Sequence, residues 1–286
     1  MSALALTLVL AAAVIHATWN YLLKRSGGGT LFVWAFATLS ALIYAPLALA
    51  IVWWQQPALG WMSLALMVAS AVIHTAYYLL LDRGYRTGDL SLVYPLARGS
   101  APLITVAVAV FLLHEHPTGL AVTGALLIAA GAVLLTGNLK RLREAGSLPA
   151  VGFALLTGCM IASYTVVDKL AVAVYLVPPL LQDWATNAGR VVIMTPMAMR
   201  QRRDIRAVWT RWRLSILGVA VLCPLSYILV LTAMVFTPVS YVAPAREISI
   251  LVAAVMGTQL LAEEDGRRRL AAAGAMVIGI VCLALG

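Results

Sequence analysis

The sequence predicts an all-α integral membrane protein with ten transmembrane helices, built as two inverted-topology five-helix repeats. Three observations lead to this fold class: the composition, the number of apolar runs, and an internal repeat. The chain has 286 residues, of which 63% are hydrophobic and 11% are charged, whereas soluble domains carry roughly 25% charged residues. No polar stretch exceeds the length of a loop, so we expect no soluble domain.

Ten apolar runs are long enough to be considered as membrane spans, since a helix needs about 20 residues to cross the hydrocarbon layer. Turn-forming and charged residues separate the runs. The first run is expected to be a spanning helix and not a cleavable signal, because Lys24 and Arg25 follow it instead of preceding it. The predicted segments are 3–23, 31–54, 61–82, 89–113, 118–138, 148–169, 176–199, 214–236, 239–261 and 268–285.

The distribution of lysine and arginine predicts the orientation of the chain. Apart from Arg98, Arg190 and Arg246, which lie within segments, these residues fall in or at the edges of the odd-numbered connections, as in 200–213, and Lys169 is the exception. Basic loops stay in the cytoplasm, so both termini should be non-cytoplasmic in a multi-pass protein of the cell inner (plasma) membrane. The net charge of +9 is explained in this way. The expected partners are a small-molecule substrate and membrane lipid, with no nucleic acid.

An internal repeat divides the chain into 1–143 and 144–286, each with five segments. The stretch from Tyr94 to Leu135 returns from Val242 onwards, and at one constant spacing Arg98 corresponds to Arg246, Glu115 to Glu263 and Gly131 to Gly279. Because five is odd, the second half must enter the membrane upside down. Inverted repeats are a recurring build of secondary transporters, with the substrate site between the repeats near the midplane.

The repeated stretch also carries a family resemblance. Tyr94-Pro95-Leu96-Ala97-Arg98, Leu113-His114-Glu115 and the glycine-rich run 124–131 resemble the ten-helix EamA type of the drug/metabolite transporter superfamily. The resemblance covers the whole chain and implies transport. Members of this superfamily move amino acids, aromatic ones included, or drugs, nucleotide sugars or lipid-linked sugars. Two departures are the second hinge, 263–265, which lacks the proline, and the termini, which many members place in the cytoplasm.

Arginines inside apolar segments are the first candidate site residues, because ionisable groups within the bilayer are rare and usually functional or paired. Arg98 and Arg246 occupy equivalent positions of the two halves. One or both could receive a substrate carboxylate or phosphate, for which guanidinium offers a bidentate fork. The alternative is a structural or gating ion pair, for instance Arg98 held by Glu247.

A second polar face lies on segment 176–199, where Asp183, Asn187 and Arg190 share one side of a helix. Either Arg190 simply neutralises Asp183, with Asn187 between them, or Asp183 is a proton-coupling group. Glu247 is the other candidate for proton coupling.

Aromatic side chains with polar handles predict a cavity that holds an organic molecule. Two segments each present a histidine one turn from aromatic residues, at 16–20 and at 74–78. The alternative is an interfacial belt of aromatic residues. Besides the two arginines, the candidate substrate-binding residues are His16, Trp19, Asn20, His74, Tyr77, Tyr78, Tyr94, Tyr164 and Tyr227.

Structural roles are predicted for residues at helix ends and bends. Glu115 and Glu263 precede helices, where a carboxylate faces the positive end of the following helix dipole. Pro95 and Pro224 would let their segments bend. The glycines at 124–131 and 274–279 give segments five and ten small faces for close packing, which in a duplicated chain can pair internally and leave a monomer.

Other classes of function lack support in the sequence. It contains no nucleophile–base set, phosphate-binding loop or dinucleotide fingerprint, and the three cysteines have no metal-ligand spacing. We therefore expect no enzyme, no cofactor and no metal. The prediction is a secondary carrier that exports small organic metabolites, above all amino acids, by alternating access. The alternatives are a carrier of nucleotide or lipid-linked sugars, a broad drug exporter, and, from another class, an intramembrane enzyme or structural membrane partner.

Overall fold

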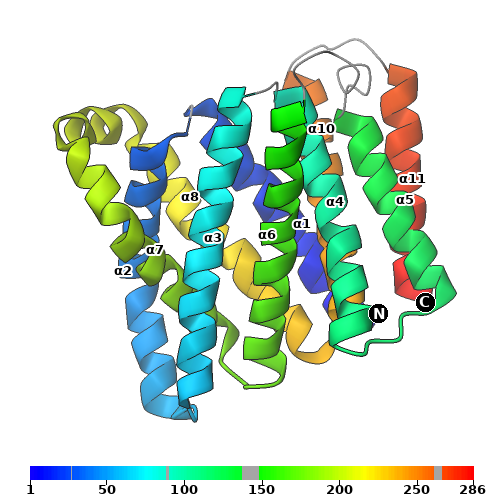
Figure 1. Ribbon diagram of the computed structural model, residues 1–286, viewed down its shortest axis with the longest axis horizontal. Coiled ribbons are helices and arrows are strands. Elements are labelled where there is room, and N and C mark those ends of the chain that lie inside the picture. Colours follow the sequence, from blue (N-terminus) through cyan, green and yellow to red (C-terminus); the bar gives the residue numbers. More distant parts are fainter. Residues whose placement is uncertain (27, 88–89, 137–147, 261–265) are drawn as a thin grey trace.

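The computed structural model describes residues 1–26, 28–87, 90–136, 148–260 and 266–286, and these fold into eleven helices (Figure 1). The described residues contain no strand, in agreement with the predicted all-α fold. The helices are α1 (Ala3–Arg25), α2 (Thr30–Gln55), α3 (Trp61–Thr87), α4 (Leu90–Leu112), α5 (Gly119–Thr136), α6 (Leu148–Ala173), α7 (Pro179–Arg200), α8 (Arg202–Phe236), α9 (Val239–Arg246), α10 (Ile248–Leu260) and α11 (Gly266–Leu285).

The ninth predicted segment is broken, which is why eleven helices replace the ten expected. Pro244 has no amide N–H, so it removes one bond from the ladder of α9. Around Glu247 the bonds tighten to three-residue spacing: its N–H donates to the Pro244 carbonyl at 3.0 Å, and its own carbonyl accepts from Ile250 N at 2.9 Å. The break puts Arg246 and Glu247 at the junction of α9 and α10.

Helix α8 is longer than predicted, because the basic stretch that was expected to be a connection is helical from Arg202 onwards. The helix also continues through Pro224, which cannot donate to the carbonyl four residues earlier. A side chain of α2 replaces the missing donor, since Ser40 Oγ donates to the Ala220 carbonyl at 2.9 Å. Tyr44 OH donates to the neighbouring Val221 carbonyl at 2.8 Å.

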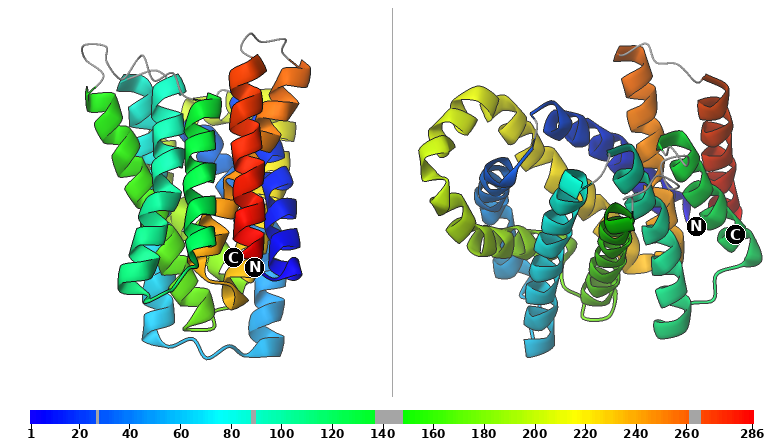
Figure 2. Two further views of the ribbon diagram at one scale, coloured as in Figure 1. Left: turned by 90° about the vertical axis from the view of Figure 1, so that its right-hand side faces the viewer. Right: turned by 45° about the horizontal axis from the view of Figure 1, so that its top comes forward.

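Both termini lie at one end of the bundle, and α1 and α6 run in opposite directions (Figures 1 and 2). The amino group of Met1 donates to the carbonyls of Leu283 at 3.4 Å and Ala284 at 3.2 Å, which ties the first residue to the end of α11. The basic ends of α1 and α7 and the basic start of α8 lie at the opposite end (Figure 1).

Five helices of the described chain are long and apolar enough to cross a membrane: α1, α2, the part of α3 from Trp61 to Leu81, α6 and α8. Shorter apolar helices occupy Leu96–Leu112, Gly119–Leu134 and Leu270–Leu285. Helix α7 has the length of a span, but it carries Gln182, Asp183, Asn187 and Arg190. The prediction of ten spans is thus supported for five helices by length and composition.

The two halves of the sequence share one core instead of forming separate bodies. Helices of the first half pack against helices of the second: α1 on α8, α2 on α7, α3 and α4 on α6, and α5 on α11. Glycines permit the last contact, because a Cβ on Gly279 would lie 2.8 Å from the Gly124 carbonyl and a Cβ on Gly131 would lie 2.9 Å from the Ala272 carbonyl. Residues from both halves of the sequence therefore meet at the interface between the two sets of helices.

Candidate functional site

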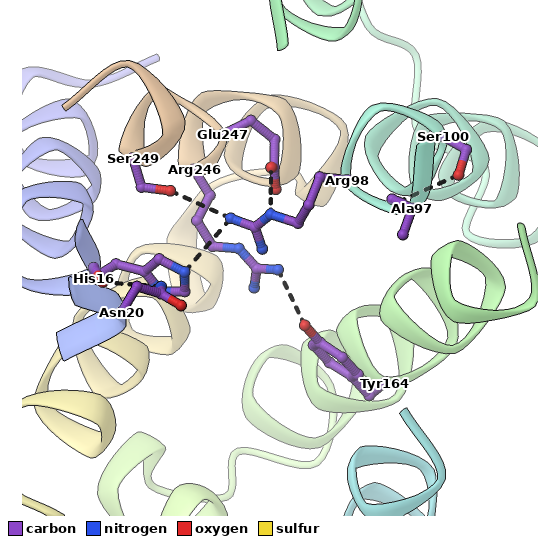
Figure 3. Close-up of polar contacts among 9 residues, drawn as sticks. All are labelled: His16, Asn20, Ala97, Arg98, Ser100, Tyr164, Arg246, Glu247 and Ser249. Carbon is purple, nitrogen blue, oxygen red and sulfur yellow. Dashed lines mark hydrogen bonds and ion pairs between the residues drawn. The ribbon is translucent and has the colours of Figure 1, made fainter. Parts of the chain in front are cut away.

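The centre of the candidate site is a pair of arginines from equivalent positions of the two halves, Arg98 on α4 and Arg246 on α9 (Figure 3). Gly158 on α6 helps to place the first of them. A Cβ on Gly158 would collide with Ser100 Oγ and would lie 3.1 Å from the Ala97 carbonyl, so the glycine lets α6 approach α4 this closely. The two arginines point toward one another across the interior, and both are buried.

Arg98 is neutralised by an acid. Its Nε lies 3.0 Å from Glu247 Oε2, and the two side chains are 6% and 2% exposed. Its Nη2 donates to Ser249 Oγ at 3.3 Å and lies 3.5 Å from His16 Nε2. The structural alternative stated for Arg98, an ion pair with Glu247, is the arrangement found. Glu247, expected as a proton-coupling group, is engaged in this pair.

Arg246 has neutral partners. Its Nη2 donates to Tyr164 OH at 3.2 Å, and its Cζ lies 5.9 Å and 5.8 Å from the ring centroids of Tyr164 and Tyr227. Within the described chain no carboxylate oxygen lies within 4 Å of this guanidinium, and its Nε has no hydrogen-bond partner. Aromatic faces attract a cation weakly. The two equivalent arginines therefore differ: Arg98 is in an ion pair with an acid, and Arg246 has no acid within ion-pair distance among the described residues.

Aromatic side chains from three helices surround Arg246. The ring of His74 on α3 stacks on Tyr164 with centroids 3.8 Å apart and meets the Tyr227 ring edge-on at 5.5 Å. Tyr77 meets Tyr164 edge-on at 5.9 Å. The Nδ1 atom of His74 lies 3.2 Å from Oγ of Ser70, one turn earlier on the same helix. This contact holds the orientation of the histidine ring. Four candidates named from the sequence thus come together.

Asp168 on α6 belongs to the same cluster, and the sequence reasoning missed it. Tyr227 OH donates to its Oδ2, and Gln182 Nε2 donates to its Oδ1 at 2.8 Å. Asp168 and Gln182 are both 0% exposed. The residue was overlooked because segment 148–169 was expected to end there. A usable signal was its position four residues after Tyr164, which puts both side chains on one face of the helix.

The candidates on α1 flank the arginine pair. The ring of His16 meets Trp19 edge-on at 4.7 Å, and Trp19 Nε1 donates to Ser226 Oγ on α8 at 3.2 Å. Asn20 turns back to its own helix, with Nδ2 donating to the His16 carbonyl at 3.0 Å. His16 reaches Arg98 directly, while Trp19 connects α1 to α8.

The polar face of α7 forms a separate group. Asn187 Nδ2 donates to Asp183 Oδ2 at 3.0 Å, and Arg190 Nη1 donates to Asn187 Oδ1 at 2.9 Å. The Cζ atom of Arg190 also lies 4.8 Å from the centroid of Tyr78, whose ring meets Tyr77 at 4.9 Å. Asn187 therefore stands between the acid and the base, and Tyr78 links this group to the aromatic cluster.

The structure changes the interpretation of Glu115. Its carboxylate was expected to face the helix that follows it, α5. Instead Oε1 accepts from Val239 N at 2.8 Å and Oε2 from Ser240 N at 2.9 Å, at the start of α9. The hinge residue of the first half thus caps a helix of the second half, which the order of residues along the chain could not reveal. Pro224 lies inside the continuous helix α8.

Three predicted residues lie outside the described residues: Glu263 entirely, and Tyr94 and Pro95 with respect to their side chains. Two hollows occur on the surface, one against Trp53 and Trp54 on α2 and one between α2 and the start of α8. Neither is lined by a candidate residue. The candidate side chains described above contact one another in the interior.

Comparison with known proteins assigns the fold and the family. A solved crystal structure superposes with a TM-score of 0.78 at 14% sequence identity, covering 100% of this chain and 98% of its own. No curated protein matches the sequence. The EamA-like transporter family matches twice, over residues 3–137 and 148–285, which is nearly the whole chain. With its apolar helices and two family repeats, this membrane protein therefore belongs to the EamA-like transporter family.

Proposed function

We propose that the protein is a secondary transporter that exports small carboxylate-bearing metabolites, amino acids with aromatic side chains among them. Membership of a transporter family supports transport of small molecules. The observation that carries the choice of substrate is Arg246, a buried guanidinium that has only neutral partners in the described chain and stands among aromatic rings. Burying an unpaired charge is costly, so a substrate carboxylate would relieve this cost.

In this proposal the two equivalent arginines have different roles. Arg246 receives the carboxylate through its bidentate fork, and Tyr164 and Tyr227 hold the organic part of the substrate by ring contacts. Arg98 stays paired with Glu247 and joins α4 to the junction of α9 and α10. This division follows from the partners of each arginine, not from the repeat, which makes them equivalent.

Alternating access would arise from rocking of one half against the other around this cluster, as inverted repeats permit. The break at Glu247 divides the ninth span near the cluster, and Glu115 ties the hinge of one half to the start of α9 in the other. Movement at this hinge would therefore be transmitted to the helix that carries Arg246.

Orientation belongs to the same proposal. The basic ends of α1 and α7 lie at the end of the bundle opposite to both termini (Figure 1), so the positive-inside rule puts the termini outside the cytoplasm. A fluorescent reporter that matures only in the cytoplasm tests this. Fused to the C-terminus it should stay dark, and bright cells would reverse the orientation.

The function is tested with the purified protein in liposomes, by counterflow against a panel of labelled amino acids, organic acids and nucleotide sugars. We expect amino acids to exchange. Arg246→Gln should reduce exchange at least tenfold, and Arg246→Lys should retain part of it, because the charge remains while the fork is lost.

Arg211→Gln is the matched control, since Arg211 also stacks on an aromatic ring, that of Trp212 at 5.1 Å, but at the exposed start of α8. It should exchange at the wild-type rate. The proposal would be contradicted if the wild-type protein exchanged nucleotide sugars alone, or if Arg246→Gln exchanged amino acids at the wild-type rate.

A further inference from the structure

Asp168 and Arg246, an acid and a base, both contact Tyr227, and neither forms an ion pair with another described residue. Tyr227 donates its hydroxyl to Asp168, while the guanidinium of Arg246 lies 5.8 Å from the centroid of the same ring. Tyr164, which accepts from Arg246, sits one helical turn before Asp168 on α6. The positive group and the negative group therefore belong to one cluster.

The surroundings of Asp168 contain one more sign of a missing partner. Its Oδ2 accepts from Tyr227 OH and its Oδ1 from Gln182 Nε2, both of which are neutral donors. Gln182 is fully buried, and its Oε1 has no hydrogen-bond partner. Buried acceptors are normally satisfied. Here a carboxylate and an amide oxygen, adjacent to one another, can both accept further hydrogen bonds.

We propose that Asp168 and Gln182 form a subsite for the ammonium group of the substrate, which makes the preferred substrate class the zwitterionic α-amino acid. The inference rests on the proposed function, in which Arg246 receives the carboxylate. An ammonium group has three donors and a full positive charge, so it can donate to the free Gln182 oxygen and to the Asp168 carboxylate at once.

The number of charges that a substrate neutralises distinguishes α-amino acids from simple carboxylic acids and simple amines. A zwitterion neutralises both the guanidinium and the carboxylate when it binds between them. A simple carboxylic acid leaves Asp168 uncompensated, and a simple amine leaves Arg246 uncompensated, and an uncompensated buried charge is costly. The cluster therefore selects against molecules that carry only one of the two groups.

The test uses three probes that differ only in their charged groups: L-phenylalanine, 3-phenylpropionate, which lacks the amino group, and phenethylamine, which lacks the carboxylate. Their half-inhibitory concentrations are measured against counterflow of labelled phenylalanine by the full-length protein in liposomes. We expect the wild type to prefer phenylalanine to either analogue by at least about tenfold. Asp168→Asn should weaken phenylalanine about 10- to 100-fold while leaving 3-phenylpropionate nearly unchanged.

Two further variants make the result independent of folding defects. Tyr227→Phe keeps the carboxylate and removes one of its donors, so it should preserve most of the preference for phenylalanine over 3-phenylpropionate. Asp183→Asn removes another buried carboxylate, which contacts Asn187 instead of the cluster, and should leave the ratio between these two probes unchanged. Gel filtration and an apparent melting temperature confirm that each variant is folded.

The outcomes distinguish the two proposals. If the wild type accepts 3-phenylpropionate as well as phenylalanine and Arg246→Gln abolishes both, the carboxylate site stands and the ammonium subsite is refuted. The subsite is also refuted if folded Asp168→Asn has the wild-type ratio of half-inhibitory concentrations for phenylalanine and 3-phenylpropionate. If that variant loses only its response to a pH gradient, Asp168 is a proton site and the ammonium subsite is again refuted. If no carboxylate exchanges, both proposals fall.

Discussion

Removing Arg98 should cost much more stability than removing Arg246, although the two residues occupy equivalent positions of the repeat. Arg98→Met leaves the Glu247 carboxylate buried without the partner that lies 3.0 Å from it. Removing one member of a buried ion pair typically costs about 3–5 kcal/mol, mostly because the remaining charge is uncompensated. We expect a loss of this size in the free energy of unfolding.

Replacing both members should be much less harmful. In Arg98→Met/Glu247→Met both buried charges disappear, and apolar residues of similar volume are often neutral or stabilising by about 1–4 kcal/mol relative to a buried pair. The double variant should therefore be more stable than either single variant. The coupling energy from the double-mutant cycle should reach about 3 kcal/mol, the upper part of the range for residues in contact.

Arg246→Met is the contrasting case. Its guanidinium forms no ion pair in the described chain, so its removal breaks none. The variant should stay within about 1 kcal/mol of the wild type, because the loss of the hydrogen bond from the guanidinium to a tyrosine hydroxyl is offset by the removal of a buried charge that has no ionic partner. It should also lose exchange in liposomes. A functional residue that is costly to bury is a recognised trade-off between stability and activity.

The free energies are measured by unfolding in mixed micelles with increasing SDS, followed by circular dichroism, on all four variants in parallel. If the loss of unfolding free energy in the double variant equals the sum of the losses in the two single variants, Arg98 and Glu247 are not coupled. A loss for Arg246→Met equal to that for Arg98→Met would show that Arg246 is a structural residue, and the assignment of the carboxylate site would then be wrong.

The same unfolding measurement tests three other contacts. Gly279→Ala should cost about 1–3 kcal/mol, because the new Cβ would lie 2.8 Å from a facing backbone carbonyl of α5. Gly274→Ala is the control: its Cβ would have no atom within 4 Å, so it should be neutral or slightly stabilising, and equal losses of stability in the two variants would contradict the packing argument. Glu115→Gln should cost about 0.5–2 kcal/mol by weakening the cap on α9, with His116→Gln as the control from the same connection, and an unchanged stability would mean that the cap contributes little. Ser40→Ala should cost about 1–3 kcal/mol, since the carbonyl freed by the proline in α8 would lose its donor; no loss would mean that this carbonyl finds another partner.

The sequence was sufficient for the features that depend on composition and on order along the chain. The apolar runs predicted the helical membrane protein, because hydrocarbon admits only segments whose backbone bonds are satisfied internally. The repeat that relates Arg98 to Arg246 predicted two halves, and the family matches twice, over residues 3–137 and 148–285. The family motif at 94–98 led to the family that the comparison identifies. Local patterns are sufficient for these inferences, because the hydrocarbon layer imposes the same requirement on every spanning segment.

The pairing of charges could not be read in the same way. Glu247 follows Arg246 directly in the sequence, yet its carboxylate pairs with Arg98 on another helix. Glu115 precedes α5 and caps α9. Side chains within hydrogen-bond distance of each other are brought there by helix packing, and contacts over such separations leave no periodic trace in the chain.

What the sequence by itself determined is the set of groups available inside the membrane: arginines, aromatic rings and a few carboxylates at known helical positions. Only the tertiary structure decided which of them neutralise one another. It joined Arg98 to Glu247, left Arg246 among neutral rings, and brought Asp168 to the same cluster through Tyr227. The physical reason is that helix faces are fixed by local periodicity, whereas the partner of a buried charge is fixed by the approach of two helices, here controlled by small residues such as Gly158.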